Sequence, residues 1–183
     1  EKFKIFFNKK MKVLDCTFKI NQSLKERLDE LRFEAEIAVR EGGRHLILSD
    51  KEVNEKKVPV PMALAIGAIN SRLVNLGIRG FASINVETSE VLDTHSFAVL
   101  LGVGATTINS YIAFDSIFQR YEKKLFNKLN FEECIHRYIK STENGLLKIM
   151  SKMGISVLSS YRGGCNFEAV GLSRSVVAEY FPK

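Results

Sequence analysis

Residues 45–87 read HLILSDKEVNEKKVPVPMALAIGAINSRLVNLGIRGFASINVE, and this stretch decides the fold. Its first four residues, HLIL, are predicted to form a strand, a charged loop follows at 50–58, and two prolines then precede an apolar segment of helical length. We predict a helix at 62–75, ended by Gly77, and a strand with alternating polarity at 81–86. A strand, a helical crossover and a second strand predict a parallel pair with a right-handed connection.

The same alternation continues on both sides of this stretch. Ser23 with Glu26 forms a capping box at the start of one helix, and Asp93 and Asn130 are placed to cap two others. The remaining predicted strands are 12–18, 105–109 and 155–158, and the remaining predicted helices are 24–40, 94–101, 111–121, 131–153, 167–171 and a last short one near the end.

The predicted fold class is therefore α/β, with alternating βα units and a mainly parallel sheet. The sheet is expected to be part of a barrel or a doubly wound fold. No linker rich in Ser, Gly or Pro divides the chain, so residues 1–183 are expected to form a single domain.

Composition excludes several classes of protein. The chain has no apolar run near the ~20 residues that span a bilayer, so no membrane association is expected. The net charge of +6 is spread over stretches that acids interrupt, which indicates solvated surfaces and not a nucleic-acid site. The first residue is Glu1 and not Met, and no signal peptide follows it, so we expect a piece of a longer protein.

The three cysteines, Cys16, Cys134 and Cys165, are odd in number and widely spaced. They predict neither a disulfide framework nor a metal cluster, and they fit the reducing cytoplasm or an organelle interior. The histidines are scattered without metal-ligand spacing, and no serine lies in a nucleophile elbow.

Polar residues follow several of the predicted strands. In parallel α/β folds, ligands bind beyond the carboxyl ends of the strands, where Asp15, Asp50, Glu87 and Asn109 are expected. These side chains could form an acid–base or metal site, or they could cap the helices that follow. An autonomous α/β enzyme or ligand-binding domain built on them is one hypothesis for the function.

Two long motifs carry a family resemblance. Residues 146–172 read LLKIMSKMGISVLSSYRGGCNFEAVGL, and residues 86–117 read VETSEVLDTHSFAVLLGVGATTINSYIAFDSI. Both resemble the central domain of glutamate synthase, the large or ferredoxin-dependent subunit, and shorter matches extend the resemblance from residue 13 to 181. The chain departs from the family pattern at four positions, Val103, Ser110, Gly164 and Cys165.

The resemblance implies a role within a larger enzyme. Glutamate synthase hydrolyses glutamine in an amidotransferase domain and channels the ammonia to a flavin domain, where reduced FMN converts an imine of 2-oxoglutarate to glutamate. The central domain links these two domains and helps to wall the ammonia channel. FMN and the iron–sulfur cluster are expected in other parts of the enzyme. No catalytic, cofactor or metal residue is expected here, and the fragment should not be active by itself.

The implied partners are the amidotransferase and FMN domains of the same polypeptide, with a small reductase subunit or ferredoxin beyond them. The electron donor stays open. An apolar stripe at 111–118 could also pair two copies of the fragment in a homodimer. Candidate residues for the domain interface or the channel are Met150, Lys152, Met153, Ser156, Tyr161, Arg162 and Glu168.

Overall fold

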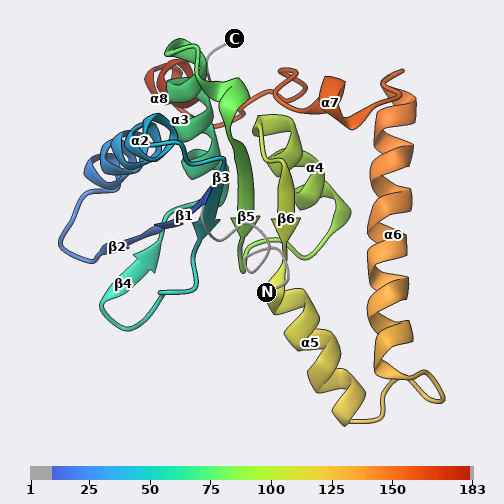
Figure 1. Ribbon diagram of the computed structural model, residues 1–183. Coiled ribbons are helices and arrows are strands. Elements are labelled where there is room, and N and C mark those ends of the chain that lie inside the picture. Colours follow the sequence, from blue (N-terminus) through green and yellow to red (C-terminus); the bar gives the residue numbers. More distant parts are fainter. Residues whose placement is uncertain (1–9, 182–183) are drawn as a thin grey trace.

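The centre of the protein is a parallel sheet. The computed structural model describes residues 10–181. Within them the sheet has four strands in the order β1-β3-β5-β6, namely β1 (Met11–Asp15), β3 (His45–Ser49), β5 (Ser83–Glu87) and β6 (Thr107–Asn109) (Figure 1). All three neighbouring pairs are parallel. The prediction of an α/β fold with a mainly parallel sheet is thus confirmed.

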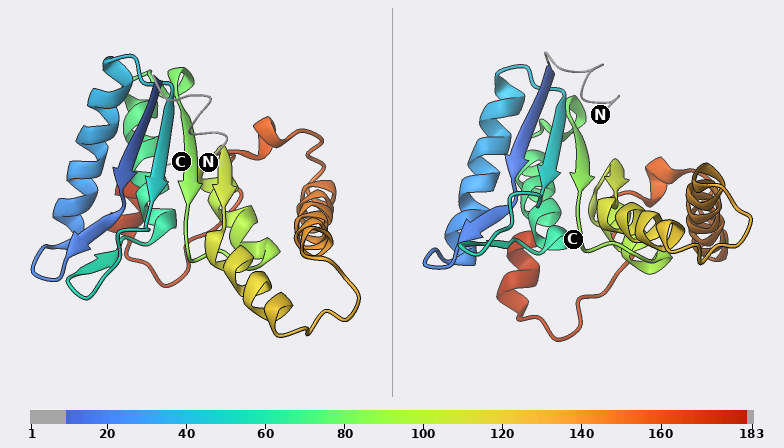
Figure 2. Two further views of the ribbon diagram at one scale, coloured as in Figure 1. Left: turned by 60° about the horizontal axis from the view of Figure 1, so that its bottom comes forward. Right: turned by 90° about the horizontal axis from the view of Figure 1, so that it is seen from below.

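Three helices connect successive strands: α2 (Leu24–Arg40), α3 (Met62–Asn75) and α4 (Thr94–Val103). The strand order advances in one direction without reversal, and α2 and α3 pack side by side against the same face of the sheet (Figure 2). A doubly wound sheet reverses its order at a switch point, whereas a barrel adds each strand on the same side. The four described strands therefore include no switch point, an order that a barrel segment and one half of a doubly wound sheet share.

The core lies between the sheet and these helices. Leu14, Leu48 and Val86 are neighbours across three strands and are buried on the helical face. Leu28 of α2 and Ile66 of α3 are fully enclosed in the same cluster. Burying a side chain of this kind contributes about 1.5–3 kcal/mol, so this layer accounts for much of the stability of the sheet.

The caps read from the sequence are present. Ser23 accepts from the backbone N–H of Glu26, whose carboxylate accepts from the N–H of Ser23 in return. Asp93 caps α4 through the N–H of Ser96 at 2.8 Å. Asn130 caps α6 (Phe131–Lys152) through the N–H of Glu133, also at 2.8 Å.

The strand predicted at 12–18 is divided, and this corrects the sequence-based boundary. Asp15 accepts from the backbone N–H and the hydroxyl of Thr17, and the turn that these bonds hold redirects the chain after β1. The next residues form β2 (Thr17–Lys19), which pairs antiparallel with β4 (Lys57–Pro59). The loop predicted at 50–58 therefore ends in a strand.

Two helices form an arm that extends from the sheet. After β6, α5 (Tyr111–Glu122) runs away from the body, and α6 returns beside it (Figure 1). The rings of Phe118 and Phe131 lie 5.5 Å apart edge to face, and those of Phe114 and Tyr138 lie 5.9 Å apart. The aromatic side chains whose spacing predicted α5 thus pack against α6 and hold the two helices together.

The predicted strand at 155–158 and the predicted helix at 167–171 are both wrong. Residues 155–157 are irregular and lead into the short helix α7 (Leu158–Tyr161). A strand needs a partner edge, but Ile155 packs among helical side chains of α4 and α6. Residues 163–172 are also irregular, because Phe167 lies against the open side of Gly102 instead of starting a helix.

Within the described residues the last helix, α8 (Arg174–Tyr180), returns to α2 and α3. Arg32 of α2 pairs with the carboxylate of Glu179 at 3.0 Å, donates to its carbonyl at 2.8 Å and stacks on the ring of Tyr180. The end of the described chain is therefore fixed to α2. Among residues 10–181, no helix combines the length and the apolar character needed to cross a bilayer.

Candidate functional site

The strand-end residues predicted from the sequence lie along one edge of the sheet. Asp15, Ser49, Glu87 and Asn109 are aligned in a single row across the four strands. Asp50 follows Ser49 directly and is completely buried. The parallel register thus places all four predicted residues at the expected edge of the sheet: Asp15, Asp50, Glu87 and Asn109.

The carboxylate of Asp50 is surrounded by donors. One oxygen accepts from the Thr88 hydroxyl at 2.8 Å and from the backbone N–H and hydroxyl of Ser89 at 2.8 and 3.0 Å. The other accepts from the Tyr111 hydroxyl at 2.7 Å. A buried carboxylate with four such bonds is satisfied and ties β3, β5 and α5 together. This arrangement favours a structural role for Asp50.

The other two carboxylates of the row are also engaged. Asp15 holds the turn to Thr17 and pairs with Lys57 at 3.0 Å. Glu87 lies 3.6 Å from the ammonium of Lys51, which in turn stands over the ring of Tyr111. Within residues 10–181, no group of three His, Cys, Asp or Glu side chains could hold a metal ion. Use of this row as an acid–base site stays a prediction.

A neighbouring acid serves a helix terminus. Glu90 accepts from the backbone N–H of Met62 at 3.0 Å, at the start of α3, where Pro61 provides no side-chain cap. Burial raises the pKa of Glu90 above its usual range. The negative charge of Glu90 at this terminus is favourable for the helix dipole.

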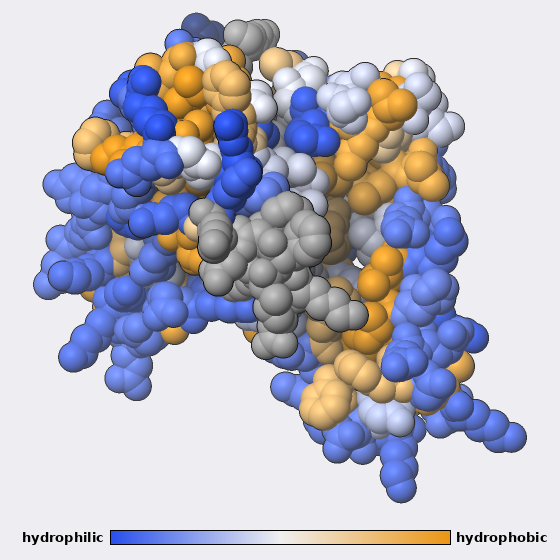
Figure 3. All heavy atoms as spheres, viewed as in Figure 1, coloured by the Kyte–Doolittle hydropathy of each residue, from blue (hydrophilic) through white to orange (hydrophobic). Residues whose placement is uncertain are grey.

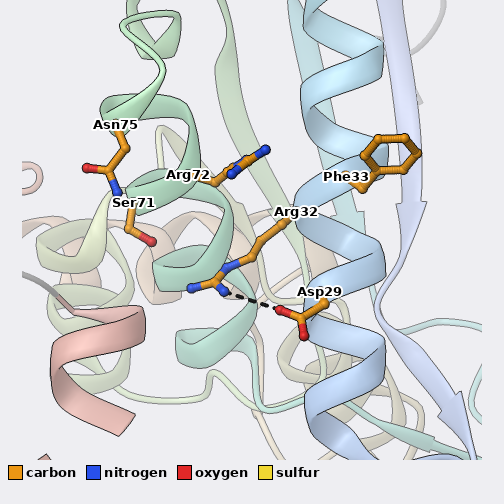
Figure 4. A pocket seen from close by; sticks show the side chains of 6 residues that line it. All are labelled: Asp29, Arg32, Phe33, Ser71, Arg72 and Asn75. Atoms are coloured by element: carbon orange, nitrogen blue, oxygen red, sulfur yellow. Dashed lines mark hydrogen bonds and ion pairs between the residues drawn. The ribbon is translucent and has the colours of Figure 1, made fainter. Parts of the chain in front are cut away.

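A polar hollow of about 330 Å³ lies between α2 and α3 (Figure 4). Its arginines already have partners: Arg32 binds Asp29 at 3.2 Å as well as Glu179, and Arg72 binds Glu36 at 2.7 Å. The sequence did not indicate this hollow, because it depends on how two separate helices pack. The residues that line it are Asp29, Arg32, Phe33, Ser71, Arg72 and Asn75.

The structure divides the seven residues proposed for an interface or channel. Met150 and Tyr161 are buried in a second apolar cluster with Ala98 and Leu101 of α4, and the Tyr161 hydroxyl has no hydrogen-bond partner in the described part of the chain. The exposed members are Lys152, Met153, Ser156 and Glu168. Met150 and Tyr161 therefore hold the arm to the body, and only the others are available to a partner.

Arg162 is half-buried just after α7. The N–H of the next residue, Gly163, donates to the carbonyl of Gly102 at 2.9 Å, which brings Arg162 to the end of α4. Arg79 of the short 3-10 helix η2 (Arg79–Phe81) comes to the same turn, where it donates to the carbonyl of Gly104 at 2.9 Å. Sequence reasoning missed Arg79, because nothing in its local pattern sets it apart from a surface arginine.

Large apolar side chains are exposed where the arm meets α7. We use the name outer apolar surface for four exposed side chains of this region: Leu147 in the last turns of α6, Met153 just after α6, Val157 just before α7 and Leu158 at its start. Further along, Val170 is 89% exposed in the segment that leads to α8. Apolar side chains also gather along α6 in Figure 3, on the side toward the body.

Comparison with known proteins identifies the family. Residues 2–173 match the family model of the glutamate synthase central domain. The chain is 49% identical over 172 residues to the glutamate synthase [NADPH] large chain of Azospirillum brasilense and 41% identical over 172 residues to that of Bacillus subtilis. It is also 42% identical over 183 residues to the chloroplastic ferredoxin-dependent glutamate synthase of rice, Oryza sativa.

These alignments include 92%, 94% and 92% of this chain, respectively, and 11% of each relative. The chain thus spans about a tenth of the length of these relatives. The resemblance found in the two long motifs is confirmed, and the chain belongs to the glutamate synthase central domain family.

Proposed function

We propose that this chain is a single domain that connects the amidotransferase and FMN domains of a glutamate synthase and helps to wall the ammonia channel between them. The observation that carries the proposal is the outer apolar surface. Exposed apolar patches of this kind are typical of surfaces that another protein part covers. Since the relatives are about nine times longer than the part aligned here, such a part is expected in the same polypeptide.

The cofactors belong elsewhere in this proposal. Cys16 and Cys134 are buried and Cys165 is exposed, so the described cysteines do not form the cluster of thiolates that an iron–sulfur centre needs. The proposal assigns the iron–sulfur centre to another domain on this ground, and it assigns FMN and the contact to ferredoxin or a reductase subunit to other domains because the family resemblance implies it. The full-length enzyme would work in the cytoplasm or an organelle interior, as the chloroplastic rice relative does by name.

The test separates the steps of the full-length enzyme. Val157→Glu places a charge on the outer apolar surface, where the native side chain is 52% exposed. We expect glutaminase activity and ammonia-dependent glutamate synthesis to persist, while glutamine-dependent synthesis falls several-fold and free ammonia appears in solution. A coupled assay of glutamate formed and ammonia released for each glutamine hydrolysed measures the change.

Val53→Glu is the matched control. Val53 is 46% exposed in the loop between β3 and β4, away from the arm, so a charge there should leave all three activities unchanged. The proposal is wrong if V157E is folded, as shown by an unchanged melting temperature, and still delivers every ammonia molecule to synthesis. Sedimentation of the isolated chain would show whether two copies pair, as predicted for the apolar stripe at 111–118.

A further inference from the structure

Arg79 is held at the end of α4 by neutral acceptors. It donates to the carbonyls of Ala82 at 2.6 Å and Gly104 at 2.9 Å, and to the side-chain oxygen of Asn70 at 2.7 Å. These bonds fix the position of the guanidinium but do not neutralise it. Arg79 is thus a rigid cation whose charge has no counterpart among its hydrogen-bond partners.

Arg162 brings a second cation to the same turn. The hydrogen bond from Gly163 to Gly102 fixes the backbone beside it, and the Nε of Arg162 is buried without a hydrogen-bond partner in the described part of the chain. Burial lowers the pKa of Arg79, and the nearby charge of Arg162 lowers it further. Two guanidinium groups therefore share a partly desolvated corner.

Arg27, which is buried, and Arg32, which is half-buried, both have carboxylate partners. Arg27 pairs with Glu30 and Glu34 at 2.7 and 2.8 Å, and Arg32 pairs with Glu179 at 3.0 Å. Neither Arg79 nor Arg162 forms an ion pair with any carboxylate of residues 10–181. Because an unpaired charge away from water is costly, a pair of them in one place indicates that a counter-charge is supplied from outside these residues.

We propose that Arg79 and Arg162 bind the carboxylate of an aspartate or glutamate that belongs to another domain of the same polypeptide. The proposal rests on the connecting role proposed above. Guanidinium groups bind carboxylates through two parallel hydrogen bonds, and the two terminal nitrogens of Arg162 form no hydrogen bond with residues 10–181. Val157 and Leu158, whose side chains are exposed, lie only a few residues before Arg162, so a domain covering them would come close to this corner.

Zero-length crosslinking of the full-length enzyme tests the proposal. Arg162→Lys keeps the positive charge and introduces an amine that a carbodiimide can join to a carboxylate in direct contact. Peptide mass spectrometry of the treated enzyme is expected to show position 162 joined to an aspartate or glutamate outside residues 1–183. Substituting that acid with its amide should then abolish the crosslink.

Arg137→Lys supplies the positive control, because Arg137 contacts Glu133 at 2.7 Å on the surface of α6. If R137K yields its crosslink to Glu133 while position 162 is joined to no carboxylate, or only to one within residues 1–183, the proposal is overturned. The ammonia-coupling assay of V157E is independent of this result. If R162K gives no crosslink to another domain while V157E still loses ammonia coupling, this inference is refuted and the connecting role remains supported.

Discussion

The hydroxyl of Tyr111 donates a 2.7 Å hydrogen bond to Oδ1 of Asp50, which is completely buried. The bond joins the first turn of α5 to the end of β3, across 61 positions of the sequence. Since the arm begins at Tyr111, this contact helps to fix the arm to the sheet. It is also the bond whose loss would leave one oxygen of Asp50 without its donor.

Tyr111→Phe is therefore expected to lower the free energy of unfolding by about 1–3 kcal/mol, the usual effect of removing a donor from a buried charged acceptor. Urea unfolding of the 183-residue chain would measure it. Tyr121→Phe is the control, because the ring of Tyr121 packs on Phe131 while its hydroxyl has no hydrogen-bond partner in residues 10–181. Equal stabilities of Y111F and Y121F would contradict the role given to the bond.

The same contact predicts a pH dependence. Burial, together with the bond to Asp50, raises the pKa of Tyr111 to about 12 from its ordinary 10.0. The folded protein then keeps a proton that the unfolded chain releases, so this contribution to stability is present below pH 10 and is lost as the pH rises towards 12. The difference in unfolding free energy between the wild type and Y111F should shrink over that interval, and a constant difference would refute the prediction.

Gly145 allows α6 to cross α4 closely. A Cβ at this position would lie 2.6 Å from both Cγ2 and Oγ1 of Thr94. Gly145→Ala should gain about 1 kcal/mol of helix propensity but lose more to this overlap, for a net destabilisation of about 1 kcal/mol. Adding Thr94→Ala should restore the loss, and urea unfolding of the double-mutant cycle measures both. A G145A protein more stable than wild type would show that the helices can separate at no cost.

The pair of Arg32 and Glu179 should control the attachment of α8. Glu179→Gln is expected to weaken this docking by up to about 1 kcal/mol, and hence to speed tryptic cleavage after Arg174 by up to about fivefold. Glu143→Gln is the control, since among residues 10–181 Glu143 pairs with Lys140 alone, at 3.8 Å on an exposed face. Identical cleavage rates for the two variants would show that other contacts hold α8.

Much of the fold could be predicted because its signals are local. The capping box of Ser23 and Glu26 and the asparagine cap of α6 depend on spacing of three residues, and both are present. The strand predicted at 155–158 failed because pairing depends on a neighbouring edge, which no local pattern shows. The helix predicted at 167–171 is absent for a related reason. The ring of Phe167 packs against Gly102, a residue distant in sequence, and no local pattern shows that contact.

The candidate site shows the same division. That Asp15, Asp50, Glu87 and Asn109 lie at one edge follows from parallel strands alone. The sequence could not predict that donors surround the carboxylate of Asp50. Two of these donors are Thr88 and Ser89, which lie in a turn after β5 and meet Asp50 only once the sheet has formed. The proximity of Arg79 and Arg162 could not be predicted either. It arises because Arg79 and Gly163, from two separate segments, both donate hydrogen bonds to carbonyls at the end of α4.

The attachment of α8 to α2 has a consequence for biosynthesis. Arg32 and Glu179 are separated by 147 positions, so α2 leaves the ribosome long before the helix that docks on it. Until then Tyr180 cannot cover its place in the core. A nascent chain halted before residue 179 should therefore have a formed sheet whose core is uncovered beside α2, and emergence of α8 would cover it.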